Sequence, residues 1–310
     1  INTTYLVTDS DGHRIIFQRV NPIFAPSVNE DIHAVTTYLA ERGVTTPQLI
    51  DAADGRHAIV DARGSVWRAL QYVAGQTFLS AGTPARCREA GRLLGGFHRA
   101  LWDYSAPLQH TRFGVHDTPH HHRQLLAALS QHAQHDQFET VAALASQLTA
   151  HYALLPTMNA LPRRMVHGDP KISNIIFDDT GRARCLIDLD TLARMPMPLE
   201  MGDALRSWCA KGGEEDRSGF DAGHFAAALA GYFEEMGTLW SREEIDAIVP
   251  ACELIAVELG MRFAADALNE SYFAWDPKRF SSASAHNLVR ARSQYHLAQA
   301  IRRQRDKLQD

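Results

Sequence analysis

The stretch MVHGDPKISNIIFDDTGRARCLIDLDTL, residues 165–192, decides the fold of this chain, because three oxygen-bearing side chains recur in it at set spacings. Asn174 follows Asp169 by five residues, and Asp188 follows Asn174 by fourteen. Two short apolar strands, expected at 175–177 and 185–189, flank a turn at 178–181. The pattern predicts a loop and a hairpin that bring the three side chains to one cleft.

Such a set of side chains suits phosphoryl transfer. That reaction needs a carboxylate to orient the acceptor hydroxyl and take its proton, and oxygen ligands for the magnesium ion that neutralises the triphosphate. The alternative is that Asp169 and Asn174 cap turns while Asp188 and Asp190 are solvated acids at a strand end. The joint spacing, with an apolar strand between the two acidic sites, favours the functional interpretation.

HGDPKISN (167–174) and IDLD (187–190) resemble the catalytic and metal-binding motifs of the aminoglycoside phosphotransferase and choline kinase superfamily. The resemblance implies a protein-kinase-like fold that uses ATP and Mg²⁺, with Asp169 as the base and Asn174 and Asp188 as metal ligands. Asp190 is expected to be a further metal ligand or an orienting residue, with an exposed acid as an equal alternative.

The same resemblance assigns supporting roles to two further residues. His167 is expected to brace the catalytic loop by hydrogen bonding, in preference to acting as an acid. Asp203 resembles the buried acid of the family that ties a helix to the loop, and its alternative is an acid near a helix N-terminus that interacts with the dipole.

Periodicity predicts an α+β chain with two lobes. Hairpins are expected at 3–20 and 57–73 with one helix between them, so residues 1–75 would form a small β-rich, nucleotide-binding lobe. From Pro84 onward long helices dominate, at 84–103, 118–132, 137–153, 199–211, 218–236, 241–269 and 283–307. Residues 76–310 would therefore form a larger, mainly helical lobe that holds the catalytic loop and the substrate site.

A narrower resemblance extends from about Ile1 to Ala300. The segments QRVNPIFAPSVNEDI, WRALQYV, HDTP, GDALR, GMRFAADALNESYF and HNLVRA resemble the N-acetylhexosamine 1-kinases. This resemblance implies an amino sugar, N-acetylglucosamine or N-acetylgalactosamine, that is phosphorylated on its anomeric hydroxyl. A kinase for another small alcohol, such as an aminoglycoside, choline or homoserine, and a nucleotide-binding pseudokinase scaffold are the competing hypotheses.

The nucleotide site departs from the pattern of eukaryotic-type kinases, because the first lysine of the chain is Lys171 and a strand lysine is missing. Arg19 is expected to bind phosphate in its place, with Gln18 as the alternative. Phe17 shares the strand face of Arg19 and would pack against adenine. The partner acid would be Glu30 or Asp31.

The nucleotide itself is expected against Gln71, Tyr72 and Val73. A glycine-containing loop that covers the phosphates in relatives would lie upstream of Ile1, so the chain is expected to lack that loop and its strand.

Candidate substrate residues are His116 and Asp117, followed by Thr118, and Arg262, Asp266 and Tyr272 near the end of a helix. All of them carry groups that hydrogen-bond sugar hydroxyls. Arg262 and Asp266 are equally consistent with an intrahelical ion pair. The run of histidines at 120–122 is interpreted as a solvated helix start and not as a metal site, because adjacent helical residues point in different directions.

Composition limits the partners. Asp and Glu total 36 against 31 for Lys and Arg, a formal charge of −5, so no basic excess indicates a nucleic acid or an anionic membrane. The four cysteines form no CxxC pair and are expected to be free core thiols. Without a signal peptide or a long apolar segment, the chain is expected to act in the cytoplasm.

Overall fold

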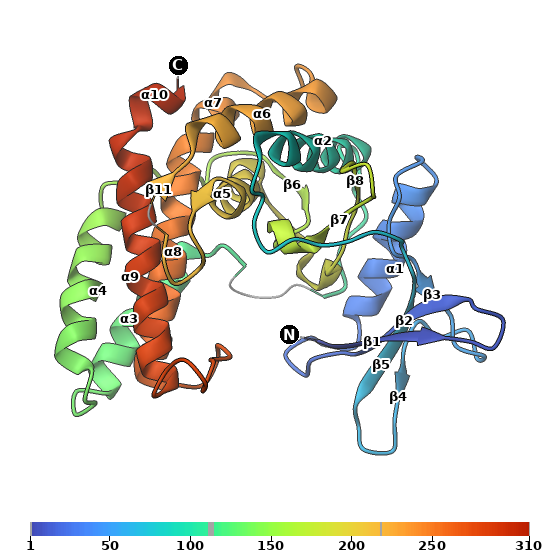
Figure 1. The fold of residues 1–310 in the computed structure, drawn as a ribbon, viewed down its shortest axis with the longest axis horizontal. Coiled ribbons are helices and arrows are strands. Elements are labelled where there is room, and N and C mark those ends of the chain that lie inside the picture. The colour runs from blue at the N-terminus through green and yellow to red at the C-terminus, as the bar shows by residue number, and fades with distance from the viewer. Residues whose placement is uncertain (1, 111–114, 218, 310) are drawn as a thin grey trace. The chain divides into compact units, whose positions relative to one another are not determined.

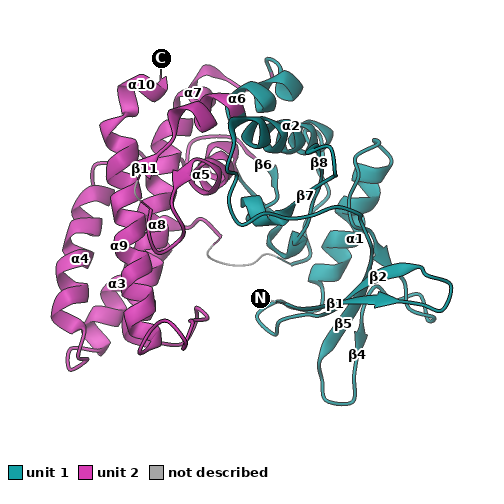
Figure 2. Ribbon diagram, viewed as in Figure 1, with its two compact units in different colours: residues 1–112, 164–195, 228–238 teal, residues 113–163, 196–227, 239–310 magenta. Residues whose placement is uncertain are grey.

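The computed structural model describes residues 2–110, 115–217 and 219–309, and Figure 1 shows the order of the elements. The chain divides into two compact units (Figure 2). Unit 1 consists of residues 1–112, 164–195 and 228–238, and unit 2 of residues 113–163, 196–227 and 239–310. This division groups the HGD loop with the N-terminal residues, so the lobe boundary at residue 75 stays a prediction.

An antiparallel sheet forms the N-terminal part of unit 1. Its strands are β1 (Thr3–Thr8), β2 (Arg14–Arg19), β3 (Leu49–Ile50), β4 (Ile59–Val60) and β5 (Val66–Gln71). The order is β1-β2-β5-β3, and β4 also pairs with β5. Helix α1 (Val28–Ala40) lies between β2 and β3 in the chain and buries the apolar positions that predicted it, Val28, Ile32, Val35 and Leu39.

The register of the sheet determines which side chains share a face. Gln18 on β2 is paired with Thr4 on β1 and with Arg68 on β5, so these three project to the same side. On the opposite side, the ring of Trp67 stacks on Phe17 at a centroid distance of 5.0 Å. The polar face and the aromatic face of the sheet are therefore distinct.

The remainder of unit 1 is built around helix α2 and short strand pairs. These elements are α2 (Pro84–Ala100), β6 (Arg163–Val166), β7 (Ile175–Phe177), β8 (Ala183–Leu186) and β9 (Ala193–Pro196), with short 3₁₀ turns η1 (Ile172–Asn174) and η2 (Leu189–Thr191). β7 pairs with β8 and β6 with β9, and α2 packs against β8. The β7–β8 register confirms the predicted hairpin, but its second strand spans 183–186 and not 185–189, so Asp188 lies after the strand.

The segment that follows β5 is attached to β7 by backbone hydrogen bonds. The amide of Gln76 donates to the carbonyl of Phe177 at 2.8 Å, and the amide of Phe177 donates back at 2.9 Å. Gly75 permits this approach, because a Cβ there would lie 2.4 Å from the oxygen of Phe177. The strand that carries the polar face is thus anchored to the hairpin of the catalytic motif.

Unit 2 is mainly helical. It contains α3 (Thr118–Gln131), α4 (Phe138–Tyr152), α5 (Met197–Trp208), α7 (Arg242–Asp246), α8 (Ile248–Asn269), α9 (Ala283–Arg303) and α10 (Arg305–Gln309), with the short pair β10 (Ala210–Lys211) and β11 (Gly219–Phe220). Helix α6 (Ala222–Met236) begins in unit 2 and ends in unit 1. Helix α8 is buried along most of its length and packs against α3, α4, α5 and α9.

The predicted α+β class is confirmed, and two of the expected helices are each divided. The helix expected at 241–269 ends at Asp246 and resumes at Ile248 as α8. Pro250 lies in the first turn of α8, where its missing N–H and its ring prevent a hydrogen bond to Asp246. Ser241 and Glu244 form a capping box that starts the shorter helix α7. The helix expected at 283–307 likewise ends at Arg303 and continues as α10.

All four cysteines are buried free thiols, as predicted. Burial raises the pKa of Cys185 to about 12, so this thiol is an unreactive core group. None of the helices in the described residues is both long and apolar enough to span a lipid bilayer.

Candidate active site

The HGD loop is held by the His167 side chain, which is completely buried. Its Nε2 lies 2.9 Å from the carbonyl oxygen of Ile187, and its Nδ1 accepts a hydrogen bond from the amide of Asp169 at 3.2 Å. Gly168 adopts φ +85°, and a Cβ there would lie 2.1 Å from the carbonyl oxygen of Thr191. One imidazole therefore connects the loop to the strand end that bears Asp188.

Asp169 lies in this loop with a cation and an amide beside it. The ammonium of Lys171 forms an ion pair with its Oδ2. The side-chain amide of Asn174 donates to the carbonyl oxygen of Asp169 at 2.8 Å and to Oδ2 at 3.1 Å. Because the side-chain nitrogen of Asn174 faces Asp169, the side-chain oxygen Oδ1 of Asn174 faces away from Asp169.

Asp188 has a left-handed backbone, with φ 66° and ψ 56°. A non-glycine residue in this region carries strain, which is common at functional sites. Burial raises the pKa of the Asp188 carboxyl, and the negative charges of Asp190 and Asp169 raise it further, against the opposing effect of Lys171. A cation bound here would offset this crowding of carboxylates.

Arg68 and Asp190 form a buried ion pair at the polar face of the sheet. The two guanidinium nitrogens donate to the two carboxylate oxygens at 2.6 and 2.8 Å. Arg68 also donates to Gln18 at 2.9 Å and to Asn29 of α1 at 3.3 Å, and the Asn2 amide donates to Asp190 at 2.6 Å. Both oxygens of Asp190 thus have partners and its side chain is buried, which excludes the exposed-acid alternative and favours the orienting role over that of a further metal ligand.

A cavity of about 520 Å³ in unit 1 is lined by Arg68, Asn174 and Asp188 of these groups. Its lining includes the polar sheet face, the segment after β5 and the hairpin end, among them Gln18, Arg68, Gln71, Tyr72, Val73, Asn174 and Asp188. The hard oxygen donors of Asn174 and Asp188 suit Mg²⁺, and the apolar lining from Ile16, Leu70 and Ile176 suits a base. The residues present therefore fit a magnesium nucleotide.

The expected phosphate-binding role of Arg19 is not supported by its position. Arg19 is exposed, and its guanidinium reaches Thr3 at 3.4 Å instead of the cavity. Phe17, expected against adenine, stacks on Trp67 at the aromatic face. The period of two along a strand places Gln18, and not its neighbours, among the cavity residues.

The two candidate partner acids on α1 also lie elsewhere. Glu30 is exposed, with an oxygen 3.6 Å from Nε2 of His57. Asp31 is buried and accepts hydrogen bonds from the amides of Gln109 and His110, both at 2.7 Å. The residue of α1 that contacts the cavity arginine is Asn29.

The sequence profile of the family described as APH, phosphotransferase enzyme family, matches residues 1–237. The chain belongs to this phosphotransferase family. Solved structures with the same fold include an amicoumacin kinase, hAmiN, in complex with AMP-PNP, Ca²⁺ and Ami (TM-score 0.65, 17% identity, covering 95% of this chain and 85% of that one). A microcompartment-associated aminopropanol kinase (0.63, 17%, 99% and 90%) and an aminoglycoside phosphotransferase from Alicyclobacillus acidocaldarius (0.61, 17%, 99% and 93%) are also similar.

In this phosphotransferase, the first group of expected substrate residues lies at the start of α3 in unit 2. His116 and Thr118 both contact the buried carboxylate of Glu258, with Nδ1–Oε1 at 3.4 Å and Oγ1–Oε2 at 2.6 Å. Burial opposes protonation of His116, yet the hydrogen bond to Glu258 and nearby acids raise its pKa above the usual value. Asp117 caps α3 by accepting from the amide of His120 at 3.0 Å.

The second group lies at the C-terminal end of α8. Both oxygens of Asp266 accept hydrogen bonds, from the amides of residues 271–273 and from Asn287 at 2.9 Å. Its carboxylate thus organises the loop after α8. This role differs from both expectations, which were sugar binding and an ion pair with Arg262. Arg262 lies over the Phe273 ring at 5.6 Å, and Tyr272 is exposed.

Asp203, expected to support the catalytic loop, lies on α5. It is buried and accepts a hydrogen bond from Arg206, one turn later on the same helix, at 2.6 Å.

Sequence reasoning missed two cations of the site. Lys171 was noted as the first lysine and not as the neighbour of Asp169, although their separation of two residues was visible. Arg68 stands in WRALQYV, directly before the segment expected to contact the nucleotide, and alternation with Trp67 and Ala69 is the signal that could have identified it.

The histidines at 120–122 are not a solvated helix start. His121 is buried and lies 3.0 Å from Gln124, and His122 lies 3.1 Å from Thr149 of α4. His122 therefore contacts α4, and Nε2 of His121 lies 4.0 Å from Glu258 of α8, so the start of α3 packs against neighbouring helices.

Proposed function

We propose that the chain transfers the γ-phosphoryl group of ATP, with Mg²⁺, to the anomeric hydroxyl of an N-acetylhexosamine. The observation that carries the proposal is that Asn174, Asp188 and the buried cation Arg68 line one cavity, with Asp169 hydrogen-bonded to Asn174. Family membership supports the phosphotransferase activity, and the resemblance to N-acetylhexosamine 1-kinases supports the acceptor.

Each polar group has a definite task in this proposal. Asp169 orients the acceptor hydroxyl and takes its proton as the bond to phosphorus forms. Lys171 stands beside that carboxylate and offsets negative charge near the transferred group. Asn174 Oδ1 and the Asp188 carboxylate would hold Mg²⁺, which when bound neutralises the phosphate oxygens.

Arg68 takes the place of the missing strand lysine. It is fixed by Asp190, Gln18 and Asn29, so its guanidinium is held at the cavity wall and little side-chain entropy would be lost on binding, although Asp190 offsets part of its charge. This observation weighs against a pseudokinase scaffold, for which the absence of a strand lysine was the main support. Binding of the nucleotide base is assigned to the segment Gln71–Val73.

The acceptor is tested by ADP release with a panel of alcohols. We expect N-acetylglucosamine or N-acetylgalactosamine to give a kcat/KM at least about tenfold above glucose, galactose, choline, homoserine and kanamycin, since a site built for the acetamido group rejects analogues that lack it. A preference for one of the other alcohols would replace the proposed acceptor while retaining the kinase. Tight ATP binding without turnover of any alcohol would support the scaffold instead.

A matched pair of variants relates the activity to the site. Asp188→Asn removes a proposed metal ligand, whereas Asp179→Asn changes an acid of the exposed turn between β7 and β8. Activity lost only in Asp188→Asn excludes a contaminating kinase as the source of ADP.

A further inference from the structure

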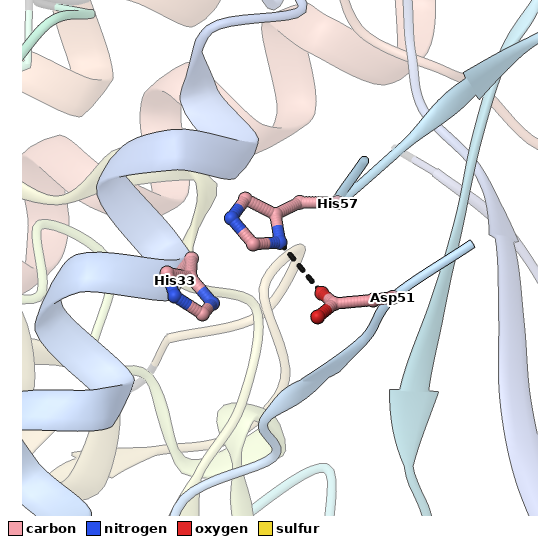
Figure 3. Close-up of side chains that lie close together, drawn as sticks. All are labelled: His33, Asp51 and His57. Atoms are coloured by element: carbon pink, nitrogen blue, oxygen red, sulfur yellow. Dashed lines mark hydrogen bonds and ion pairs between the residues drawn. The ribbon is translucent and has the colours of Figure 1, made fainter. Parts of the chain in front are cut away.

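Two histidines and two carboxylates outside the proposed active site converge at one place in unit 1. His33 belongs to α1, Asp51 follows β3, and His57 precedes β4 (Figure 3). One ligand atom from each of these three lies within 4.8 Å of the others. Glu30 is three residues before His33 on α1, and its Oε2 is 3.6 Å from Nε2 of His57.

The local contacts of the cluster leave metal-binding atoms available. Nδ1 of His57 lies 2.7 Å from Oδ1 of Asp51, which orients this imidazole. His33 meets His57 through the ring faces, with centroids 3.8 Å apart and planes at 16°. The stack uses the ring faces and leaves the nitrogen lone pairs of His33 in its ring plane, so a turn of this side chain is needed to direct a nitrogen to an ion shared with His57.

We propose that His33, Asp51 and His57, with Glu30 as a fourth ligand, bind a divalent transition-metal ion of the Zn²⁺ class. Imidazole nitrogen combined with carboxylate oxygen is a donor set of Zn²⁺ and its neighbours, whereas Mg²⁺ prefers oxygen alone. Atoms bound tetrahedrally to one Zn²⁺ at about 2.0–2.2 Å lie about 3.3–3.6 Å from one another. Coordination therefore requires the ligand atoms to close by up to about 1.2 Å and the His33 ring to turn out of its stack, so that both imidazole lone pairs point at one ion.

The ion would join α1 to the segment 51–57. Helix α1 also carries Asn29, which contacts Arg68, and Asp31, which holds the backbone of residues 109 and 110. A metal ion bound to α1 would therefore restrain the helix that contacts Arg68. Because the ligands come from three separate segments, binding would stabilise the folded chain by mass action.

The test is a Zn²⁺ titration of the full chain by calorimetry, with millimolar Mg²⁺ present to occupy the oxygen-only site. Wild type should bind one equivalent, and Co²⁺ in its place should give the visible absorption of a nitrogen and oxygen ligand set. His33→Gln removes one ligand and keeps the Asp51–His57 pair, so it should fold normally yet bind Zn²⁺ at least about tenfold more weakly.

His57→Gln should behave similarly, and the rise in melting temperature with Zn²⁺ should disappear in both variants. His13→Gln is the matched control, because His13 is an exposed histidine beside a single carboxylate, Asp9, at 3.0 Å. Failure of wild type to bind Zn²⁺ more tightly than His33→Gln, or an unchanged Co²⁺ spectrum in both His33→Gln and His57→Gln, would overturn the proposal. Neither result bears on the kinase reaction, which uses other residues.

Discussion

At the scale of single residues, Asp169 tests the mechanism. Asp169→Asn keeps the size of the side chain and an acceptor oxygen but cannot take a proton. General-base catalysis contributes about 100- to 10,000-fold, so we expect kcat to fall at least about 100-fold with little change in the KM for ATP. Steady-state ADP release measures both parameters. A variant that retains more than about a third of wild-type kcat, far outside this range, would exclude Asp169 as the base.

Replacement of Arg68 tests which cation at the cavity binds the phosphates of the nucleotide. Arg68→Met leaves the carboxylate of Asp190 buried and unpaired, so we expect a loss of about 3–5 kcal/mol in the free energy of unfolding together with weaker ATP binding. Urea unfolding and nucleotide titration are the measurements.

Arg19→Met is the control for Arg68. Arg19 is exposed on the adjacent strand, and its replacement should change stability by no more than about 0.5 kcal/mol and leave ATP binding intact. Adding Asp190→Asn to Arg68→Met should restore part of the stability, because the uncompensated charge is then removed. If Arg19→Met weakens ATP binding more than Arg68→Met does, Arg19 would be the phosphate-binding residue instead.

At the scale of elements, the connection between β5 and β7 depends on Gly75. Gly75→Ala would place a methyl group 2.4 Å from the oxygen of Phe177 at a φ of +143°. We expect a loss of about 3 kcal/mol or more in unfolding free energy and a higher KM for ATP, because the segment 71–73 would shift.

Gly64→Ala is the comparison, since Gly64 has φ +79° with open space around its Cα. Gly64→Ala should lower the free energy of unfolding by only about 1–2 kcal/mol, the cost of placing a non-glycine residue in the left-handed region. Equal losses in the two variants would show that the close contact at β7 contributes nothing.

The junction of α3 and α8 should depend on pH through His116. The folded pKa of His116 is raised, so its contribution to stability is fully present below the unfolded value of about 6.5 and is lost as the pH rises through the folded value. His116→Gln should therefore cost more stability at pH 6 than at pH 9, measured by urea unfolding. Thr118→Val removes a hydrogen bond to Glu258 whose donor does not titrate, so it should cost about the same at both pH values. A pH-independent cost for His116→Gln would contradict this pairing.

At the scale of the whole molecule, nucleotide binding should stabilise the fold. At a free concentration about 100 times Kd, a ligand that binds only the native state adds about 2.7 kcal/mol. We expect AMP-PNP with Mg²⁺ to raise the melting temperature of wild type, and the Mg²⁺-dependent part of this rise to vanish in Asp188→Asn. An equal rise in the variant would remove Asp188 from the metal site.

The sequence by itself determined the catalytic motif, because Asp169, Asn174 and Asp188 are brought together by one loop and one hairpin. Short-range geometry of that kind follows from spacing and turn residues. The helices of unit 2 were similarly visible from their periodicity, although the break between α7 and α8 at Pro250 was not predicted.

Only the tertiary structure decided which residues of distant segments meet. Arg68 reaches Asp190 across 122 positions of the chain because β5 pairs with β2 in one particular register, and a shift by one residue would have turned Arg19 to the cavity instead. His33, Asp51 and His57 likewise meet because α1 lies beside the segment 51–57. Strand register and helix placement depend on packing interactions throughout the core. They cannot be deduced from the spacing of residues within one local segment.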